Sequence, residues 1–201
     1  ETAPGREHVA DRLDDAGADR FGHGRERYAR QDRVGSAQAV RRDQLGEVFR
    51  HDIRSIGVRF TATPVSGSLP TSRSLILVTP DGERTMNTFL GISTQFDNAH
   101  LDRELIRDSA ILYLEGYLFD RAEAKSAFQE AAAEAKRAGR KVALTLSDAF
   151  CVDRHRAEFL AFIRNGVDIV FANESEIKSL YETSSYDDAA KRAADSGLTA
   201  V

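Results

Sequence analysis

Apolar and polar residues alternate in regular patterns along the chain from Asp43 onward. Between Asp43 and Val58 the apolar residues recur at helical spacing and stop at Gly57, which predicts one helix. Further along, the pattern predicts a strand together with its exit over 109–119, and strands over 141–147, 167–172 and from 198 onward. It predicts helices over 121–139, 153–164, 174–181 and 186–196. Strand–helix–strand units of this length predict the α/β class, with a parallel sheet, right-handed crossovers and helices on the faces of the sheet.

Further strands are predicted before this alternating part. Residues 58–65 (VRFTATPV) read as one strand, and residues 72–90 contain two strand-like runs on either side of Pro80-Asp81-Gly82. A proline followed by Asp-Gly is typical of a tight turn. We therefore expect a hairpin that turns at Asp81-Gly82, preceded by one more strand.

Residues 1–42 differ in composition from the rest of the chain. They are rich in Arg and Asp, and their few large apolar residues follow neither the strand period nor the helix period. Such a segment buries too little surface to offset the entropy that it loses on ordering. We expect a disordered or aberrant segment, and a frameshift in the gene model is one hypothesis for its origin. Because the acidic residues nearly balance the arginines, a basic arm for nucleic acid is not expected.

The overall composition suits one globular α/β domain, or a large part of one. The chain has 201 residues, of which 41% are hydrophobic and 30% charged, and its formal net charge is −4. This charge gives no reason to expect a nucleic acid or an acidic membrane as a partner. No apolar stretch approaches the roughly 20 residues of a membrane span, and no secretion signal is visible, so we expect a cytoplasmic protein.

Candidate chemistry is expected where the predicted strands end, because ligands of open α/β sheets bind beyond the carboxyl ends of the strands. Polar residues follow three strands, at 115–117, 147–149 and 173–176. Neither a GxGxxG fingerprint nor a GxxxxGK[ST] loop occurs, which argues against a dinucleotide-binding Rossmann site and a P-loop nucleotidase. The single cysteine, Cys151, excludes an internal disulfide and is expected to be small and half-buried rather than reactive. The histidines show no zinc spacing and no GxSxG elbow is present, so we expect the histidines at the surface or at helix ends.

The motif Asn173-x-x-Glu176 has two interpretations. Asn is a good N-cap, and a Glu three positions later can bond back to the amide of the cap, so helix capping explains the spacing without a ligand. The functional interpretation uses the same geometry. A helix N-terminus attracts phosphate, and a carboxylate there can hold a water molecule bound to Mg²⁺. The two interpretations are compatible.

Arg84, just after the Asp81-Gly82 turn, is a second candidate. It is either an exposed arginine on a strand or a guanidinium that neutralises a transferring phosphate. The residue alone does not decide between these alternatives.

Taken together, the segments resemble the PfkB/ribokinase-type carbohydrate and nucleoside kinases, and within them the adenosine-kinase-like branch. The resemblance covers roughly Asp43 to Val201 and follows the order of the family, through DQLGEVFRHDIRSIGV, SLILVTPDGERTMNTFLG, ILYLEGYLFD, LTLSDAFCVDRHRAEF and VDIVFANESEIKSLYE. It implies a ribokinase-like parallel sheet flanked by helices, with a small β-lid over about residues 58–90. It also implies an ATP- and Mg²⁺-dependent kinase that phosphorylates a hydroxymethyl group of an adenosine-like nucleoside or of a sugar.

The resemblance implies roles for five residues. Asn173 and Glu176 match the motif that organises Mg²⁺ and the nucleotide phosphates, with Glu176 acting on the metal through water. Arg84 matches the arginine that contacts the transferring phosphate. Met86 and Tyr117 match positions that wall the acceptor site, and Tyr117 is placed to stack on a base or a sugar ring. A homodimer through the lid strands is also compatible with the resemblance.

The chain also departs from the pattern of this family. The family's acceptor-binding Asp, its Gly-Gly motif and its Gly-Ala-Gly-Asp motif, which contains the general base, are not found. The chain begins with Glu1, has Met86 as its only methionine and ends in GLTAV, which reads as the start of a strand. We therefore expect a partial kinase domain over 43–201 that is incomplete at both ends. The alternatives are a ketose or deoxysugar kinase of the same family, and a non-catalytic remnant that binds nucleotide weakly or only dimerises.

Overall fold

The computed structural model describes residues 40–67 and 69–200 of the chain. The chain divides into two units, Glu1–Asp32 and Arg33–Val201, and every described element belongs to the second unit. Most of the segment 1–42 with the atypical composition therefore lies outside the described residues, as does Val201.

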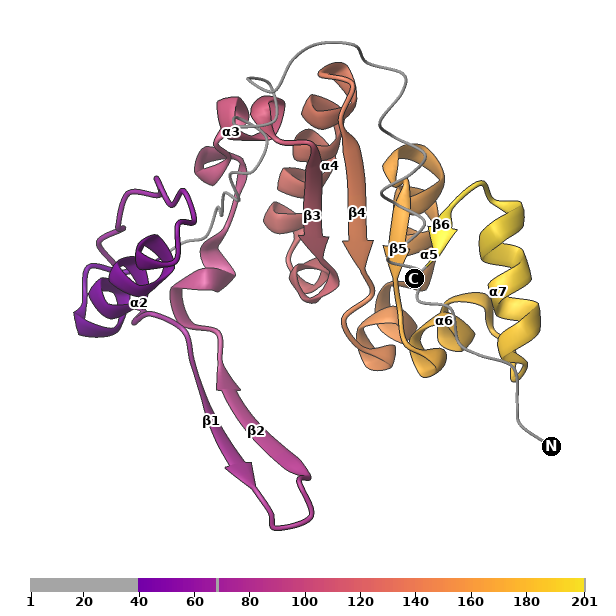
Figure 1. The fold of residues 1–201 in the computed structure, drawn as a ribbon, viewed down its shortest axis with the longest axis horizontal. Coiled ribbons are helices and arrows are strands. Elements are labelled where there is room, and N and C mark those ends of the chain that lie inside the picture. Colours follow the sequence, from indigo (N-terminus) through magenta and orange to yellow (C-terminus); the bar gives the residue numbers. More distant parts are fainter. Residues whose placement is uncertain (1–39, 68, 201) are drawn as a thin grey trace, which may run out of the picture. The chain divides into compact units, whose positions relative to one another are not determined.

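Four parallel strands form the sheet that the alternating pattern predicts. They are β3 (Ile111–Glu115), β4 (Lys141–Thr145), β5 (Ile169–Phe171) and β6 (Thr199–Ala200), side by side in the order β3-β4-β5-β6 (Figure 1). Leu114, Leu144, Val170 and Ala200 are paired in one row across the sheet, and the first three are buried. The α/β class and the parallel pairing of β4 with β5 are thus confirmed.

Helices follow the strands as the pattern predicts. They are α4 (Ala122–Arg137), α5 (Ala149–Gly166), α6 (Glu174–Tyr181) and α7 (Tyr186–Asp195). Helix α5 begins earlier than predicted, because the Asp148 side chain accepts a hydrogen bond from the Cys151 amide (2.6 Å) and caps the helix there. None of the helices formed by residues 40–67 and 69–200 combines the length and the apolar character that a membrane span needs.

The core gathers between the sheet and helices α4 and α5. Helix α4 buries Ala127, Ala131 and Ala135, which recur once per turn on one face, and the helix contacts β3 and β4. Such small side chains let a helix approach a sheet closely. At the end of β3, the Phe119 ring stacks on Phe159 of α5 with a centroid distance of 4.1 Å. This stack anchors the short 3₁₀ helix η4 (Gly116–Asp120), which leaves the strand, onto α5.

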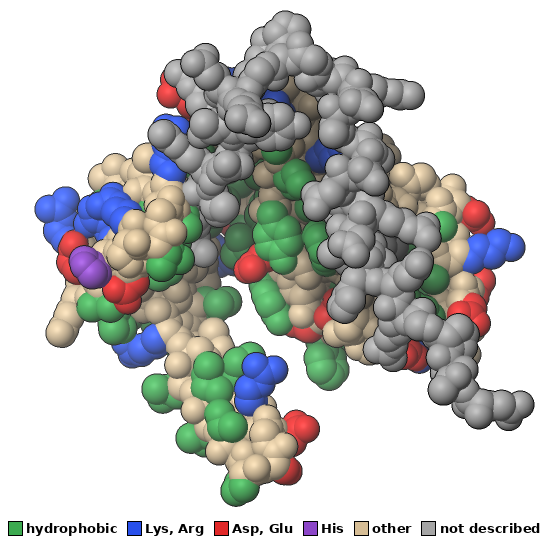
Figure 2. Space-filling model, viewed as in Figure 1, with side chains coloured by type: hydrophobic (Ala, Val, Ile, Leu, Met, Phe, Trp, Pro, Cys, Tyr) green, Lys and Arg blue, Asp and Glu red, His purple; other side chains and the backbone are tan. Residues whose placement is uncertain are grey.

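The hairpin expected around Asp81-Gly82 is also present. Strands β1 (Arg73–Val78) and β2 (Arg84–Phe89) pair antiparallel, and Gly82 adopts a φ of +86° at the turn. Every residue of the two strands is exposed, including Leu75, Ile76 and Met86. Figure 2 shows apolar side chains along this hairpin. A two-stranded hairpin with both faces exposed is marginally stable by itself.

The first predicted helix is confirmed as α2 (Gln44–Ser55). The side chain of Asp43 caps it by accepting a hydrogen bond from the Gly46 amide (2.8 Å), and Gly57 takes a left-handed φ of +88° just beyond its end. Three short elements were not predicted, namely η2 (Gly91–Gln95), η3 (Asn98–His100) and α3 (Arg103–Asp108). Each is too short to show a recognisable period.

The prediction of a strand over 58–65 is wrong. Among the described residues this segment forms no regular strand, and Val65 makes only an isolated parallel bridge with Arg41. The buried ring of Phe60 packs edge-on against Phe49 of α2, with the centroids 5.5 Å apart. The one buried apolar residue of the segment, Phe60, therefore packs on a helix, which local alternation could not reveal.

Candidate active site

The candidate site lies where strands β3, β4 and β5 end. Gly116 and Tyr117 follow β3, Ser147 and Asp148 follow β4, and Asn173 follows β5. Because the three strands are parallel neighbours, their carboxyl ends lie along one edge of the sheet. The three polar strand ends that the sequence singles out are therefore brought together.

Asn173 and Glu176 form a complete capping box at the start of α6. The Asn173 side-chain oxygen accepts a hydrogen bond from the Glu176 amide (2.9 Å), and the Glu176 carboxylate accepts one from the Asn173 amide (3.1 Å). The other carboxylate oxygen accepts a hydrogen bond from the Asn173 side-chain amide (2.7 Å). Glu176 is almost fully buried. The capping interpretation is thus confirmed, and the phosphate interpretation stays a prediction.

The same arrangement fits a hydrated Mg²⁺ ion better than a direct ligand cage. In the part of the chain that the structure describes, no group of three or more His, Cys, Asp or Glu side chains is placed to hold a metal ion. Mg²⁺ at phosphate-transfer sites keeps several waters and uses one or two carboxylates. An ionised carboxylate can accept about four hydrogen bonds. The Glu176 carboxylate accepts two from Asn173, so it can still accept a hydrogen bond from a water molecule bound to the metal. The first amides of α6 have no helical acceptor and favour an anion.

Tyr117 is tied to the neighbouring strand end through Ser147. The tyrosine hydroxyl donates to the Ser147 carbonyl oxygen (3.0 Å), and the Tyr117 amide donates to the Ser147 hydroxyl (3.3 Å). Partial burial raises the pKa of the Tyr117 hydroxyl, and the negative charges of Asp148 and Glu176 raise it further. Tyr117 follows β3 and Glu176 follows β5, and the carboxyl ends of both strands lie along the same edge of the sheet. Half of the Tyr117 side chain remains exposed and available for stacking.

Ser147 and Asp148 are site residues whose roles the sequence did not reveal. Ser147 has a left-handed φ of 72°, which is uncommon for a residue other than glycine and occurs often at functional sites. Asp148 caps α5, and its negative charge contributes to the raised pKa of Tyr117. Their position after an apolar strand was the one available signal.

Cys151 is buried completely, more deeply than the half-buried position expected for it. Its thiol donates to the Gly116 carbonyl oxygen (3.3 Å), and burial raises its pKa to about 11. Such a thiol is inert at neutral pH, so the expectation that Cys151 is not a reactive residue agrees with its surroundings.

Arg84 and Met86 lie on the hairpin, where both are exposed. Arg84 pairs with Val78 and Met86 with Ile76 across the two strands. Among the described residues Arg84 forms no salt bridge, and no hydrogen bond or ion pair connects the hairpin residues to Tyr117 or Glu176. The roles of Arg84 and Met86 therefore stay predictions.

His155 does not fit the expectation of a surface histidine. It lies within α5, where the backbone leaves helical geometry (φ −124°, ψ 20°), and only 18% of its side chain is exposed. Both ring nitrogens face carboxylates, those of Asp120 and Glu158.

Solved structures with the same fold include kinases. The adenosine kinase from Sinorhizobium meliloti is 46% identical over 85% of this chain and 53% of its own, with a TM-score of 0.79. A probable sugar kinase from Rhizobium etli CFN 42 is 44% identical over 82% of this chain and 50% of its own, with a TM-score of 0.78. A ribokinase II-like protein from E. coli, solved with ATP and Mg²⁺, is 18% identical over 86% of this chain and 57% of its own, with a TM-score of 0.72. The fold is therefore ribokinase-like.

The family follows from the sequence match. Residues 29–201 match the pfkB family of carbohydrate kinases, and none of the curated proteins compared with the chain matches it. The chain belongs to the pfkB family of carbohydrate kinases. It spans about half the length of the solved relatives that are most similar in sequence.

Proposed function

We propose that the protein is an ATP- and Mg²⁺-dependent kinase that phosphorylates a hydroxymethyl group of an adenosine-like nucleoside. One observation carries the assignment as a kinase: a half-exposed aromatic ring, Tyr117, and the capping box of Asn173 and Glu176 both follow carboxyl ends of the same parallel sheet. An aromatic face suits a nucleoside base, and a helix N-terminus with a carboxylate suits phosphates. The likeness to the S. meliloti adenosine kinase supports the same acceptor class.

In the proposed reaction, some residues of the chain would bind the phosphates and the acceptor, and others would neutralise the charge of the phosphoryl group. The amides at the start of α6 bind phosphate oxygens, and Asn173 holds that helix start in place. Glu176 orients water molecules on the nucleotide side. Arg84 neutralises the phosphoryl group in transfer, and Tyr117 and Met86 wall the acceptor. Glu176 would hold Mg²⁺ through water, and the bound ion would supply positive charge against the developing charge of the phosphates.

A sugar acceptor is the second candidate. The likeness to the R. etli probable sugar kinase, at 44% identity, favours it almost as strongly as the nucleoside. Tyr117 does not separate the two acceptors, because an aromatic ring also packs against a sugar ring.

The hairpin suggests a second copy of the chain as a partner. Its apolar residues Leu75, Ile76, Leu77, Val78 and Met86 are all more than half exposed. Two copies that pack their hairpins together would cover part of this surface. Sedimentation of the chain with and without Leu77→Lys tests this proposal, and dimers that persist in the variant would contradict it.

A chimera tests the acceptor directly. Residues 43–200 replace the matching segment of the S. meliloti adenosine kinase, which supplies the motifs that this chain lacks. The chimera is assayed with ATP, Mg²⁺ and a panel of adenosine, other nucleosides, ketoses and deoxysugars, beside the unmodified enzyme. We expect kcat/KM for adenosine to exceed that for any sugar by at least about tenfold. A preference for a sugar would move the assignment to the second candidate, and a folded but inactive chimera would favour a non-catalytic remnant.

A further inference from the structure

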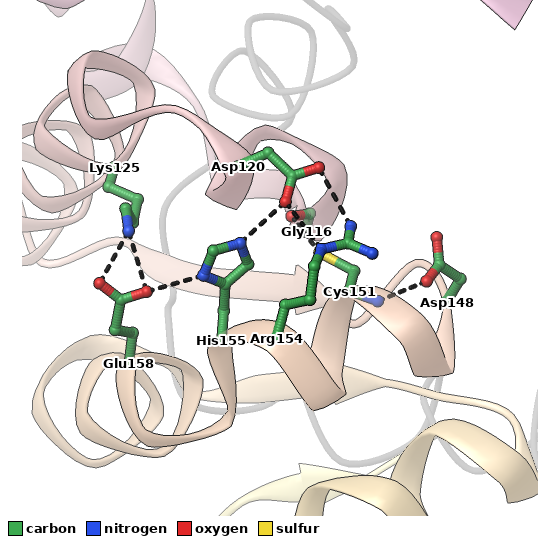
Figure 3. A network of polar contacts seen from close by, with 8 residues as sticks. All are labelled: Gly116, Asp120, Lys125, Asp148, Cys151, Arg154, His155 and Glu158. Carbon is green, nitrogen blue, oxygen red and sulfur yellow. Dashed lines mark hydrogen bonds and ion pairs between the residues drawn. The ribbon is translucent and has the colours of Figure 1, made fainter.

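A polar network around His155 joins helix α5 to η4 (Figure 3). The Nε2 atom of His155 lies 2.8 Å from a carboxylate oxygen of Asp120, and Nδ1 lies 3.0 Å from one of Glu158. Arg154 donates two hydrogen bonds to Asp120 (3.2 and 3.1 Å). Lys125 of α4 lies 2.7 and 2.9 Å from the two oxygens of Glu158.

The two carboxylates require a doubly protonated His155. An ionised carboxylate only accepts hydrogen bonds, and a neutral imidazole has a single N–H to donate. The hydrogen bond from His155, together with those from Arg154, lowers the pKa of Asp120. Lys125, and after it His155, lowers the pKa of Glu158. Both acids therefore stay ionised at neutral pH, and the geometry is that of an imidazolium between two anions.

The short helix η4 is attached to α5 at three places. At its start the Gly116 carbonyl accepts the Cys151 thiol, and near its end the buried ring of Phe119 stacks on Phe159. Neither attachment changes with pH near neutrality, because the pKa of the thiol is about 11. Asp120, the last residue of η4, is the third attachment, and only this one depends on a histidine proton.

We propose that doubly protonated His155 is a positioning residue that helps to hold η4 and so, together with the two hydrogen bonds between Tyr117 and Ser147, positions the Tyr117 ring and makes the acceptor site respond to pH. The inference rests on the proposed function in one respect, the place of Tyr117 at the acceptor. A neutral ring keeps at most one of its two hydrogen bonds as a donor, so either Asp120 or Glu158 loses the bond from His155. In the tautomer with its proton on Nδ1, Asp120 is held by Arg154 alone and η4 is less tightly held.

NMR spectra of the 201-residue chain test the proposal without a ligand. Long-range ¹H–¹⁵N spectra report the protonation of each histidine nitrogen, and aromatic spectra follow the tyrosine rings between pH 5 and 8.5. His155→Gln and Tyr117→Phe assign the two signals. We expect both nitrogens of His155 to carry protons at pH 5.5, and the Tyr117 ring signals to shift with the same midpoint as His155. The shift should disappear in His155→Gln and shrink in Asp120→Asn.

His51 offers a matched control. It also lies beside a carboxylate, with Nδ1 3.0 Å from Asp52, but it has only that one partner and its side chain is 81% exposed. His51→Gln should leave the titration of the Tyr117 signals unchanged. A His155 ring with one proton throughout the pH range, or Tyr117 signals that do not follow His155, would overturn the proposal. The wild-type titration decides this even if a variant fails to fold.

Adenosine binding to the same chain adds a functional measurement. We expect the affinity to fall about two- to fivefold between pH 6 and 8, the range of a partly exposed ion pair, and to lose this dependence in His155→Gln. Binding that is equally strong at both pH values would overturn the proposal. If adenosine does not bind at any pH, the proposed function is contradicted instead, and the spectra alone decide the role of His155.

Discussion

Glu176 combines a structural cap and a charge, and one substitution separates them. Glu176→Gln in the chimera keeps a side-chain oxygen for the Asn173 backbone amide, but it removes the negative charge and the acceptor of the Asn173 side-chain amide. We expect the free energy of unfolding to fall by about 1–2 kcal/mol for the lost buried hydrogen bond, and the Mg²⁺ concentration for half-maximal activity to rise about 10- to 100-fold. Urea unfolding and a magnesium titration of the activity measure the two effects.

Glu174 provides the control for this experiment. It lies in the same turn of α6 but is exposed and pairs with Lys178. Glu174→Gln should leave the magnesium titration unchanged. An unaltered magnesium requirement in Glu176→Gln as well would leave only the capping role for this residue.

Cys151 should behave as an inert core residue. Burial raises its pKa to about 11, so at pH 8 only about one thiol in a thousand is ionised, and the sulfur is also shielded from solvent. We expect no reaction with a disulfide reagent such as DTNB in the folded chain, and the release of one equivalent of thionitrobenzoate after unfolding in urea. Because the chain has a single cysteine, the stoichiometry is unambiguous. Rapid labelling at pH 8 without urea would contradict the buried position.

At the scale of elements, the exit of strand β3 depends on a glycine. A Cβ atom at Gly116 would lie 2.8 Å from the carbonyl oxygens of Leu146 and Thr145 and 3.0 Å from the Phe159 ring. Gly116→Ala should therefore push η4 away from β4 and α5, and we expect a loss of about 1–3 kcal/mol in the free energy of unfolding. Urea unfolding checks the value.

Gly166 is the matched glycine for this substitution. It is the last residue of α5, and a Cβ atom there would meet only Ala132, at an ordinary contact distance of 3.8 Å. Gly166→Ala should be neutral or slightly stabilising, because alanine favours a helix more than glycine does. Equal losses in both variants would show that the crowding at Gly116 is not the cause.

At the scale of the whole molecule, the proposed function predicts only one half of a phosphoryl-transfer site in this chain. Asn173, Glu176 and Arg84 are the candidates for the phosphate side, whereas the Gly-Ala-Gly-Asp motif with the general base does not occur in the 201 residues. A general base is typically worth about 10² to 10⁴ in rate, and an anion-hole donor about 10² to 10³. We therefore expect no detectable turnover by this chain alone with ATP, Mg²⁺ and adenosine. Turnover within about a hundredfold of the S. meliloti enzyme would reveal another base in the chain.

Much of the fold could be predicted from the sequence because its signals are local. Helical periodicity and capping residues marked α2, α4, α6 and α7, and the short apolar runs marked the four parallel strands. The motif at Asn173 and the aromatic residue at Tyr117 could be found for the same reason, since each follows directly after an apolar strand. The strand predicted over 58–65 was wrong, and its buried residue Phe60 packs on a helix instead. Alternation of apolar and polar residues indicates which residues are buried, but it does not show which element they pack against.

Contacts between segments that are distant in the chain could not be predicted from the sequence. The ring of His155 meets Asp120 across 35 positions of the chain, and Tyr117 meets Ser147 across 30. Neither pair has a spacing that a helix or a strand would produce. Parallel strands bring their carboxyl ends together only once the sheet has formed, so only the tertiary structure places Ser147 beside Tyr117 and His155 beside Asp120. The sequence by itself determined the elements and the family, and the packing of η4 between β4 and α5 determined which side chains share the site.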